Sequence, residues 1–216
     1  MKRTAFTVLE LLVVIVIILL IAALMFPVFS SVRKRARETS CINNLRQIYA
    51  AWSLYTSDHD GTPPWDFHML VPYIKSREVL LCPDDVYGGF NSDTTARAGL
   101  PVSYDYKAFM FERVLPRPFQ LIRDADPNFG FLLCYLHGRL YDARIGGKPT
   151  EANYCGKVLR VRRDGSVKAV DVPLRRYEYG QGRCMWELLT DEPMPKDYGQ
   201  MDSIGKLCAG EIVCAR

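Results

Sequence analysis

The feature that most constrains this chain is an apolar run from Phe6 to Phe29, FTVLELLVVIVIILLIAALMFPVF. Glu10 is its only charged residue, and no ionisable side chain occurs from Leu11 to Phe29. As an α-helix at about 1.5 Å per residue, the run is about as long as the ~30 Å hydrocarbon core of a bilayer. We therefore predict a single membrane-spanning segment near the N-terminus, with the rest of the chain tethered to a membrane or delivered through it.

Ordinary membrane signals account for this run only in part. A cleaved secretory signal peptide has a shorter apolar region followed by a small-residue cleavage site. Here the run is long, and basic residues follow it at Arg33, Lys34, Arg35 and Arg37. A plain transmembrane anchor explains the length but leaves Glu10 unexplained, because a carboxylate inside a membrane helix costs at least ~2.5 kcal/mol.

A third interpretation accounts for Glu10. A short basic leader, Met1 to Ala5, precedes Phe6-Thr-Val-Leu-Glu10 and then purely hydrophobic residues. Over about residues 2–30 the chain resembles the class III signal of type IV pilins and of the pseudopilins of type II secretion. The resemblance implies that a prepilin peptidase cuts between Ala5 and Phe6 and that the new Phe6 amine is methylated. Ala5 stands where this family usually has glycine.

The resemblance also assigns roles to two residues inside the run. It implies that Glu10 pairs with the N-terminal amine of a neighbouring subunit during assembly, so that a buried carboxylate meets a buried cation. Many pilins also carry a proline at the offset of Pro27. Proline inside a helix removes a backbone donor and bends the axis, so we predict a kink at this residue.

After Ser30 the pattern becomes amphipathic, which predicts a helix with one buried stripe. Its apolar residues recur at mostly three- and four-residue steps: Val32, Ala36, Ile42, Leu45, Ile48, Tyr49, Trp52 and Tyr55. We predict one continuous, kinked helix over 6–57, which ends before the turn-forming residues Asp60-Gly61 and the prolines that follow.

The predicted organisation has four parts. Residues 1–5 are the leader, 6–29 the transmembrane or filament-core helix, 30–57 the amphipathic half of that helix, and 58–216 a soluble periplasmic or extracellular domain. The predicted fold is α+β and pilin-like, with the long helix packed on an antiparallel sheet and a loop-rich C-terminal region.

The clearest strand signal is a hairpin. Alternating residues lie on both sides of Asp164-Gly165, from Val158 to Arg163 and from Ser166 to Val172. Asp-Gly between two such runs predicts a two-residue hairpin turn.

Basic residues are dense around this hairpin, and the four that would form a polyanion patch, for example for DNA, are Arg160, Arg162, Arg163 and Lys168. The alternative, which we favour, is the solvated face of a hairpin whose charges also protect a sheet edge.

The chain has seven cysteines, spread from residue 41 onward: Cys41, Cys82, Cys134, Cys155, Cys184, Cys208 and Cys214. No Cys-x-x-Cys occurs, and His59, His68 and His137 show no metal-ligand spacing, so we predict neither a metal nor a cofactor. Scattered cysteines in a membrane-anchored domain favour an oxidising compartment, although several could instead be buried free thiols. Because seven is odd, at least one is unpaired or pairs between chains.

The resemblance bears on the cysteines too. Many pilins close a C-terminal loop with a disulfide, which implies a bridge from Cys184 to either Cys208 or Cys214 and leaves the choice open. An oxidised C-terminal domain favours an N-in, C-out orientation in a bacterial inner membrane, followed by a periplasmic or cell-surface filament.

No catalytic motif is present: the chain has no Gly-rich phosphate loop, no Gly-x-Ser-x-Gly and no His-Glu-x-x-His, and we do not expect an enzyme. The expected function is a structural subunit of a type IV pilus or a type II secretion pseudopilus. Its partners would be the membrane, other pilin-like subunits and the prepilin peptidase. The alternatives are a static membrane-anchored binding domain and a minor pilin that binds DNA.

Overall fold

The computed structural model describes residues 7–89, 99–107, 117–141, 153–178, 180–200 and 203–214. The chain divides into two compact units, 1–39 and 40–216, which are described separately. One helix, α1 (Val8–Asp58), has 51 residues and contributes to both units. The predicted helix of residues 6–57 therefore agrees with α1 to within two residues at the described ends, while the leader and Phe6 lie outside the described residues.

The first unit consists, where described, of the N-terminal part of α1. Residues Val8–Phe26 form a stretch of 19 residues with a mean hydropathy of 3.3, long and apolar enough to cross a membrane. None of that stretch is buried within the chain. Helical backbone continues through Pro27, and a kink at that residue stays a prediction.

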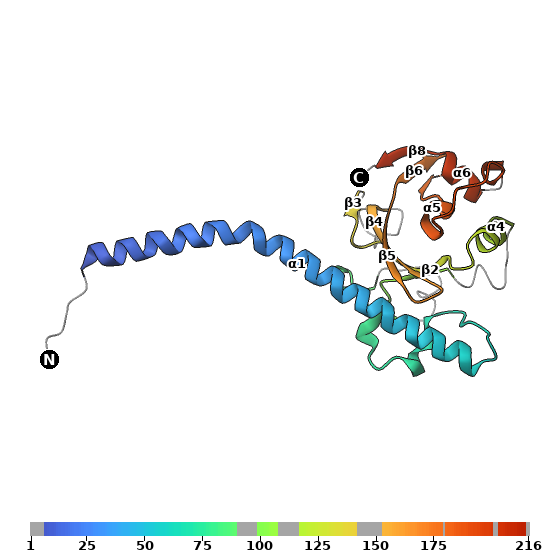
Figure 1. The fold of residues 1–216 in the computed structure, drawn as a ribbon, viewed down its shortest axis with the longest axis horizontal. Helices are drawn as coiled ribbons and strands as arrows, with labels where there is room; N and C mark the ends of the chain where they lie inside the picture. The colour runs from blue at the N-terminus through green and yellow to red at the C-terminus, as the bar shows by residue number, and fades with distance from the viewer. Residues whose placement is uncertain are drawn as a thin grey trace. The chain divides into compact units, whose positions relative to one another are not determined.

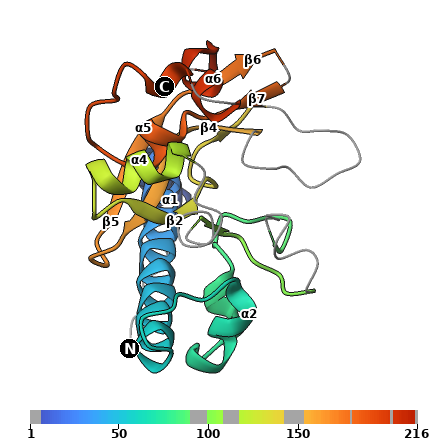
Figure 2. The ribbon, with the colours of Figure 1, turned by 90° about the vertical axis from the view of Figure 1, so that its right-hand side faces the viewer.

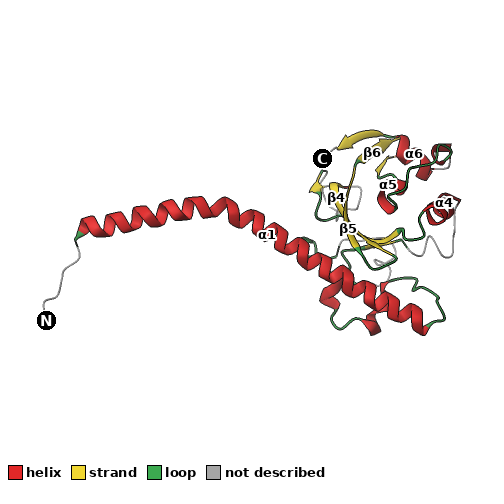
Figure 3. Cartoon of the chain, in the orientation of Figure 1, coloured by secondary structure: helices red, strands yellow, loops and turns green. Residues whose placement is uncertain are grey.

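The second unit is α+β, with its described strands from residue 105 onward and antiparallel pairing throughout its described sheets (Figure 3). The strands of the larger sheet are β1 (Asp105–Tyr106), β2 (Gly130–Cys134), β3 (Arg139–Leu140), β4 (Tyr154–Arg162) and β5 (Val167–Val172). Their order is β1-β2-β4-β3, with β5 also paired to β4. A smaller sheet in the order β7-β6-β8 consists of β6 (Leu174–Tyr177), β7 (Gly180–Gly182) and β8 (Glu211–Cys214).

Short helices complete the second unit (Figure 1). They are α2 (Phe67–Leu70), η1 (Val71–Tyr73), η2 (Arg77–Leu80), α4 (Arg117–Ala125), α5 (Met185–Leu189), η5 (Tyr198–Gln200) and α6 (Ser203–Ala209). Helix α2 lies beside the last turns of α1 (Figure 2), where the Tyr73 hydroxyl donates a 3.0 Å hydrogen bond to the Asp58 carboxylate.

The core of the second unit forms between the C-terminal part of α1 and the larger sheet. From residue 41 onward the predicted stripe packs into the core: Leu45, Ile48 and Trp52 are 0%, 1% and 7% exposed, while Ile42 and Tyr49 are half-buried. The rings of Trp52 and Phe131 on β2 lie 4.9 Å apart, centre to centre. The predicted packing of the long helix on an antiparallel sheet is therefore confirmed. This agreement concerns the α+β architecture and does not extend to a pilin fold.

The predicted hairpin is present as β4 and β5, but its turn differs. The Arg162 carbonyl accepts a 3.0 Å bond from the Gly165 amide, and the Arg162 amide donates a 2.9 Å bond to the Ser166 carbonyl. This is a three-residue loop with Gly165 at a φ of 82°, rather than the predicted two-residue turn. A β-carbon at Gly165 would also meet the Tyr49 ring. The hairpin tip is therefore shaped by its packing on α1.

Candidate metal-ligand cluster and predicted site residues

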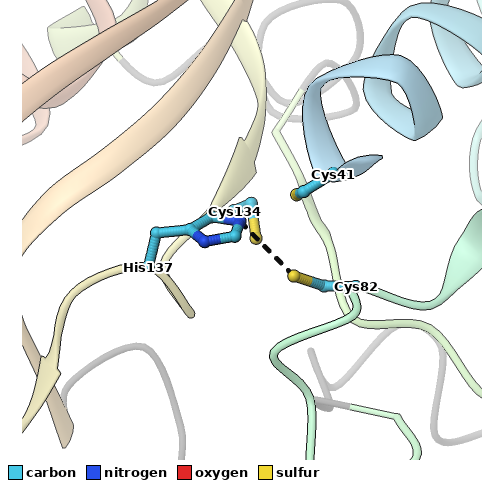
Figure 4. A group of neighbouring side chains, drawn as sticks. All are labelled: Cys41, Cys82, Cys134 and His137. Carbon is cyan, nitrogen blue, oxygen red and sulfur yellow. Dashed lines mark hydrogen bonds between the residues drawn. The ribbon is translucent and has the colours of Figure 1, made fainter. Parts of the chain in front are cut away.

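Four side chains converge in the core of the second unit (Figure 4). Cys41 comes from α1, Cys82 follows η2, Cys134 ends β2, and His137 lies in the turn after β2. The four candidate ligand atoms, three sulfurs and one imidazole nitrogen, all lie within 4.8 Å of one another. All four residues are 3% exposed or less.

Local structure explains how each side chain reaches this point. Cys41 stands one helical turn before Leu45, on the buried stripe of α1. The Asn44 side chain of the same helix donates a 3.0 Å hydrogen bond to the Leu81 carbonyl, which holds the segment before Cys82 against α1.

A tight turn brings His137 back towards Cys134. The Gly138 amide donates a 3.0 Å bond to the Tyr135 carbonyl, and a β-carbon at Gly138 would collide with the carbonyl oxygen of Cys155. Only glycine therefore fits where this turn passes β4. The turn places the His137 ring beside the end of β2.

Short polar contacts surround the His137 ring. His137 Nε2 lies 3.5 Å from Cys82 Sγ, and His137 Nδ1 lies 2.8 Å from an oxygen of Asp84. With its proton on Nδ1, beside this carboxylate, the ring would turn the lone pair of Nε2 towards the sulfur of Cys82. Cys41 Sγ donates to the Tyr104 hydroxyl at 3.7 Å.

The thiols also influence one another's ionisation. Hydrogen bonds from Cys134 and Cys41 lower the pKa of Cys82, against the effect of burial. Burial raises the pKa of Cys134 well above its ordinary value, and the neighbouring thiols raise it further. The three thiols are therefore coupled, and the charge of one opposes ionisation of Cys134.

The donor set limits what the cluster can do. Three sulfurs and one imidazole suit soft or borderline metal ions such as Zn²⁺, and do not suit Mg²⁺ or Ca²⁺, which take oxygen ligands. Without an ion, the same side chains would form a hydrogen-bonded group of thiols, or a disulfide between two of them with the third left over.

No model of a known family, no curated protein and no solved structure matches this chain. The chemistry of the cluster therefore rests on the residues themselves.

The absence of Cys-x-x-Cys and of a histidine spacing typical of metal sites predicted no metal ion, whereas the local signal present is Cys134-x-x-His137. The other two ligands are remote in sequence, with Cys82 and His137 separated by 55 residues. The Cys-x-x-His pair could have been noticed, but nothing in the sequence pattern indicates that Cys41 and Cys82 join it.

Glu10, the predicted assembly residue, takes part in a local arrangement. Its carboxylate accepts 2.8 Å hydrogen bonds from the amide and the hydroxyl of Thr7, and the Thr7 hydroxyl lies 3.3 Å from the Glu10 amide. Thr7-Val-Leu-Glu10 is thus a capping box that satisfies free amides at the start of α1. The cleavage residues Ala5 and Phe6 lie outside the described part of the chain.

The four residues of the predicted polyanion patch do not form an open basic surface. Arg160 is fully buried and its guanidinium lies 2.7 Å from Asp191. Lys168 lies 2.8 Å from the same carboxylate. Arg162 is half-buried, 3.2 Å from Asp126, and the Arg163 guanidinium lies 5.4 Å from the centre of the Trp52 ring.

This arrangement corrects the picture of β4 as a strand with one solvated face. Arg160 alternates with Leu159 and Val161, yet all three are buried, because β4 is an inner strand covered on both faces. The Arg160 side chain also donates to the Leu188 carbonyl of α5 at 3.2 Å. Both sequence interpretations place Arg160 on an exposed face, whereas its side chain is buried.

Two disulfides join the C-terminal region to the sheet and to itself. Cys184 is bonded to Cys208, with Cα atoms 4.4 Å apart, which is one of the two pairings left open by the sequence. Cys214 instead bonds Cys155 on β4, with Cα atoms 6.0 Å apart. The remaining three cysteines are those of the cluster.

Proposed function

We propose that this chain is a pilin-like filament subunit, held in the bacterial inner membrane by the N-terminal part of α1 and assembled through that same segment. The observation that carries the proposal is the bare apolar helix. Every large apolar side chain described between Val8 and Phe29 is at least 45% exposed. An apolar surface of this extent requires a partner outside the chain, either lipid or other apolar helices.

The rest of the chain supports this placement. Two disulfides within the second unit fit an oxidising compartment and so support an N-in, C-out orientation. Glu10 supports the filament over a plain anchor, because its charge in an apolar environment is stabilised when a neighbouring subunit supplies a cation. The segment would leave the membrane for the filament core after cleavage before Phe6.

A static membrane anchor is the second candidate, and the capping box is what favours it. The hydrogen bonds between Thr7 and Glu10 give this carboxylate a local role that needs no neighbouring subunit. In that case the helix would hold the domain at the membrane without polymerising.

Three substitutions separate the charge of Glu10 from its capping role. Glu10→Gln removes the charge but keeps a residue that completes a capping box, whereas Thr7→Ala removes the cap and keeps the charge. Glu10→Ala removes both. The readout is the fraction of the chain in sheared filaments relative to the membrane fraction of the native host.

Filament assembly predicts that Glu10→Gln and Glu10→Ala both lose incorporation while remaining in the membrane, and that Thr7→Ala is largely incorporated. Normal incorporation of Glu10→Gln would refute the charge-pairing mechanism. The mass of the N-terminal peptide provides an independent check: a chain that begins at methylated Phe6 supports the filament, and one that retains Met1 supports the static anchor.

A further inference from the structure

We propose that Cys41, Cys82, Cys134 and His137 bind one Zn²⁺ ion in a closed, structural site. The spacing of the ligand atoms is the first argument. Zn–S bonds of about 2.3 Å in a tetrahedron place the sulfurs about 3.8 Å apart. The four donor atoms already lie within 4.8 Å of one another, and Cys82 Sγ is 3.5 Å from His137 Nε2. Shifts of an ångström or less bring them onto one ion.

The environment of His137 is the second argument. Metal-binding histidines commonly donate their other ring N–H to a carboxylate, which orients the ring and increases its basicity. Asp84 lies in that position, 2.8 Å from Nδ1, while Nε2 faces the sulfurs. A histidine that merely filled core space would need no such orientation towards three thiols.

The partition of the cysteines is the third argument. The other four cysteines form disulfides, while these three approach one another as thiols. A divalent ion would bind the sulfurs as thiolates and neutralise most of the charge that burial opposes. A disulfide between two of the three would leave the third sulfur and the oriented imidazole without that function.

The site is structural rather than catalytic in character. All four positions of a tetrahedral ion would be filled by protein atoms, and all four residues are buried, so no position is left for substrate or water. The compact sulfur-rich set fits a single borderline ion and favours zinc. The ion would join α1, the segment after η2 and the end of β2.

This proposal is independent of filament assembly, since the cluster lies wholly within the second unit. Its test uses the full-length chain purified in detergent without chelators. We expect about one zinc ion per chain by elemental analysis. X-ray absorption at the zinc edge should show three sulfurs at about 2.3 Å and one nitrogen at about 2.0–2.1 Å. Alkylation should label the three cluster cysteines only after denaturation with a chelator.

Matched variants assign the ligands. Cys134→Ser should lose bound zinc, whereas His137→Cys should retain it with four sulfurs around the ion. His68→Gln, at an exposed histidine of α2, should bind zinc like the wild type. Asp84→Asn should weaken zinc binding about 10- to 100-fold, as measured by competition with a chromophoric chelator, and should still reach full occupancy at high zinc.

Three results would overturn the proposal. One is a wild-type chain, purified with zinc in the medium, that contains no zinc and three alkylatable thiols or a third disulfide. Another is zinc that persists unchanged in Cys134→Ser. The third is a zinc spectrum dominated by oxygen ligands. If Cys134→Ser fails to fold, the X-ray absorption spectrum of the wild type at the zinc edge still tests the proposal, because it reports the ligands around the ion directly.

Discussion

From Val8 to Phe26 no part of α1 is buried within the chain, whereas from Cys41 to Tyr55 the same helix carries a stripe of core residues. The first stretch consists of apolar side chains, with Glu10 in its first turn. The second mixes polar and apolar residues with helical periodicity. Both segments have the same backbone conformation, so the difference lies in what surrounds the side chains.

The contrast shows two ways in which one helix can be stabilised. Where a polar face alternates with an apolar face, the chain supplies its own apolar partner, as Trp52 and Phe131 do. Where apolar residues occupy the whole circumference and none is buried within the chain, the chain does not supply the apolar surroundings that such a helix prefers. If the two stretches are independent, a change in the apolar stretch alters membrane association and leaves the stability of the second unit unchanged.

The largest effect is expected from deleting residues 1–32. Apolar residues contribute about −0.3 to −0.6 kcal/mol each at the centre of a membrane helix, so the stretch contributes on the order of 5–10 kcal/mol to insertion. The shortened chain should be soluble without detergent, and its thermal unfolding midpoint should match that of the full chain. A shortened chain that stays with membranes, or no longer folds, would contradict the independence of the two stretches.

A smaller but sharper effect is expected from Trp52→Ala. Truncating this buried ring should lower the free energy of unfolding of the second unit by about 3–5 kcal/mol, because it leaves a cavity and removes the 3.0 Å hydrogen bond to the Tyr106 hydroxyl. Thermal unfolding of the full chain in detergent, followed by near-UV circular dichroism, measures the change.

Two controls go with it. Phe26→Ala should change the unfolding of the second unit by less than about 0.5 kcal/mol. Trp65→Ala, at a tryptophan that is 38% exposed, should fall between the two. Equal effects of Trp52→Ala and Phe26→Ala would remove the distinction between the stretches.

The smallest effect concerns pH and belongs to the second unit. Burial by itself would raise the pKa of Asp191, but hydrogen bonds from Lys168 and Arg160 bring it below its ordinary value. A pKa lowered by folding contributes stability above the unfolded value of about 3.9, and this contribution is lost as the pH falls further.

Asp191→Asn should therefore destabilise the domain by about 1–3 kcal/mol at pH 7, because it leaves the buried Arg160 without its anion. It should also flatten the fall in unfolding midpoint below about pH 4, and should leave the slope between pH 7 and pH 5 unchanged. Parallel pH profiles for the variant and the wild type would show that Asp191 does not carry this dependence.

Local patterns in the sequence were sufficient for local structure. An unbroken apolar run and then a three- and four-residue repeat predicted α1 to within a few residues, since helical neighbours are close in sequence. Asp164-Gly165 predicted the hairpin. Its loop has three residues rather than the predicted two, and Gly165 in this loop lies against the Tyr49 ring. The resemblance to pilins narrowed the partner of Cys184 to two cysteines, and the fold selected Cys208.

Long-range contacts decided the rest. Alternation along β4 indicated an exposed Arg160, but Asp191 and α5 cover that face. The cluster at Cys134 combines side chains from α1, a loop and a strand end, and their convergence depends on how these elements pack. By itself the sequence determined which segment is long and apolar enough to cross a membrane, since that depends on the segment's own side chains. Only the tertiary structure decided which cysteines meet, because that is set by packing between distant segments.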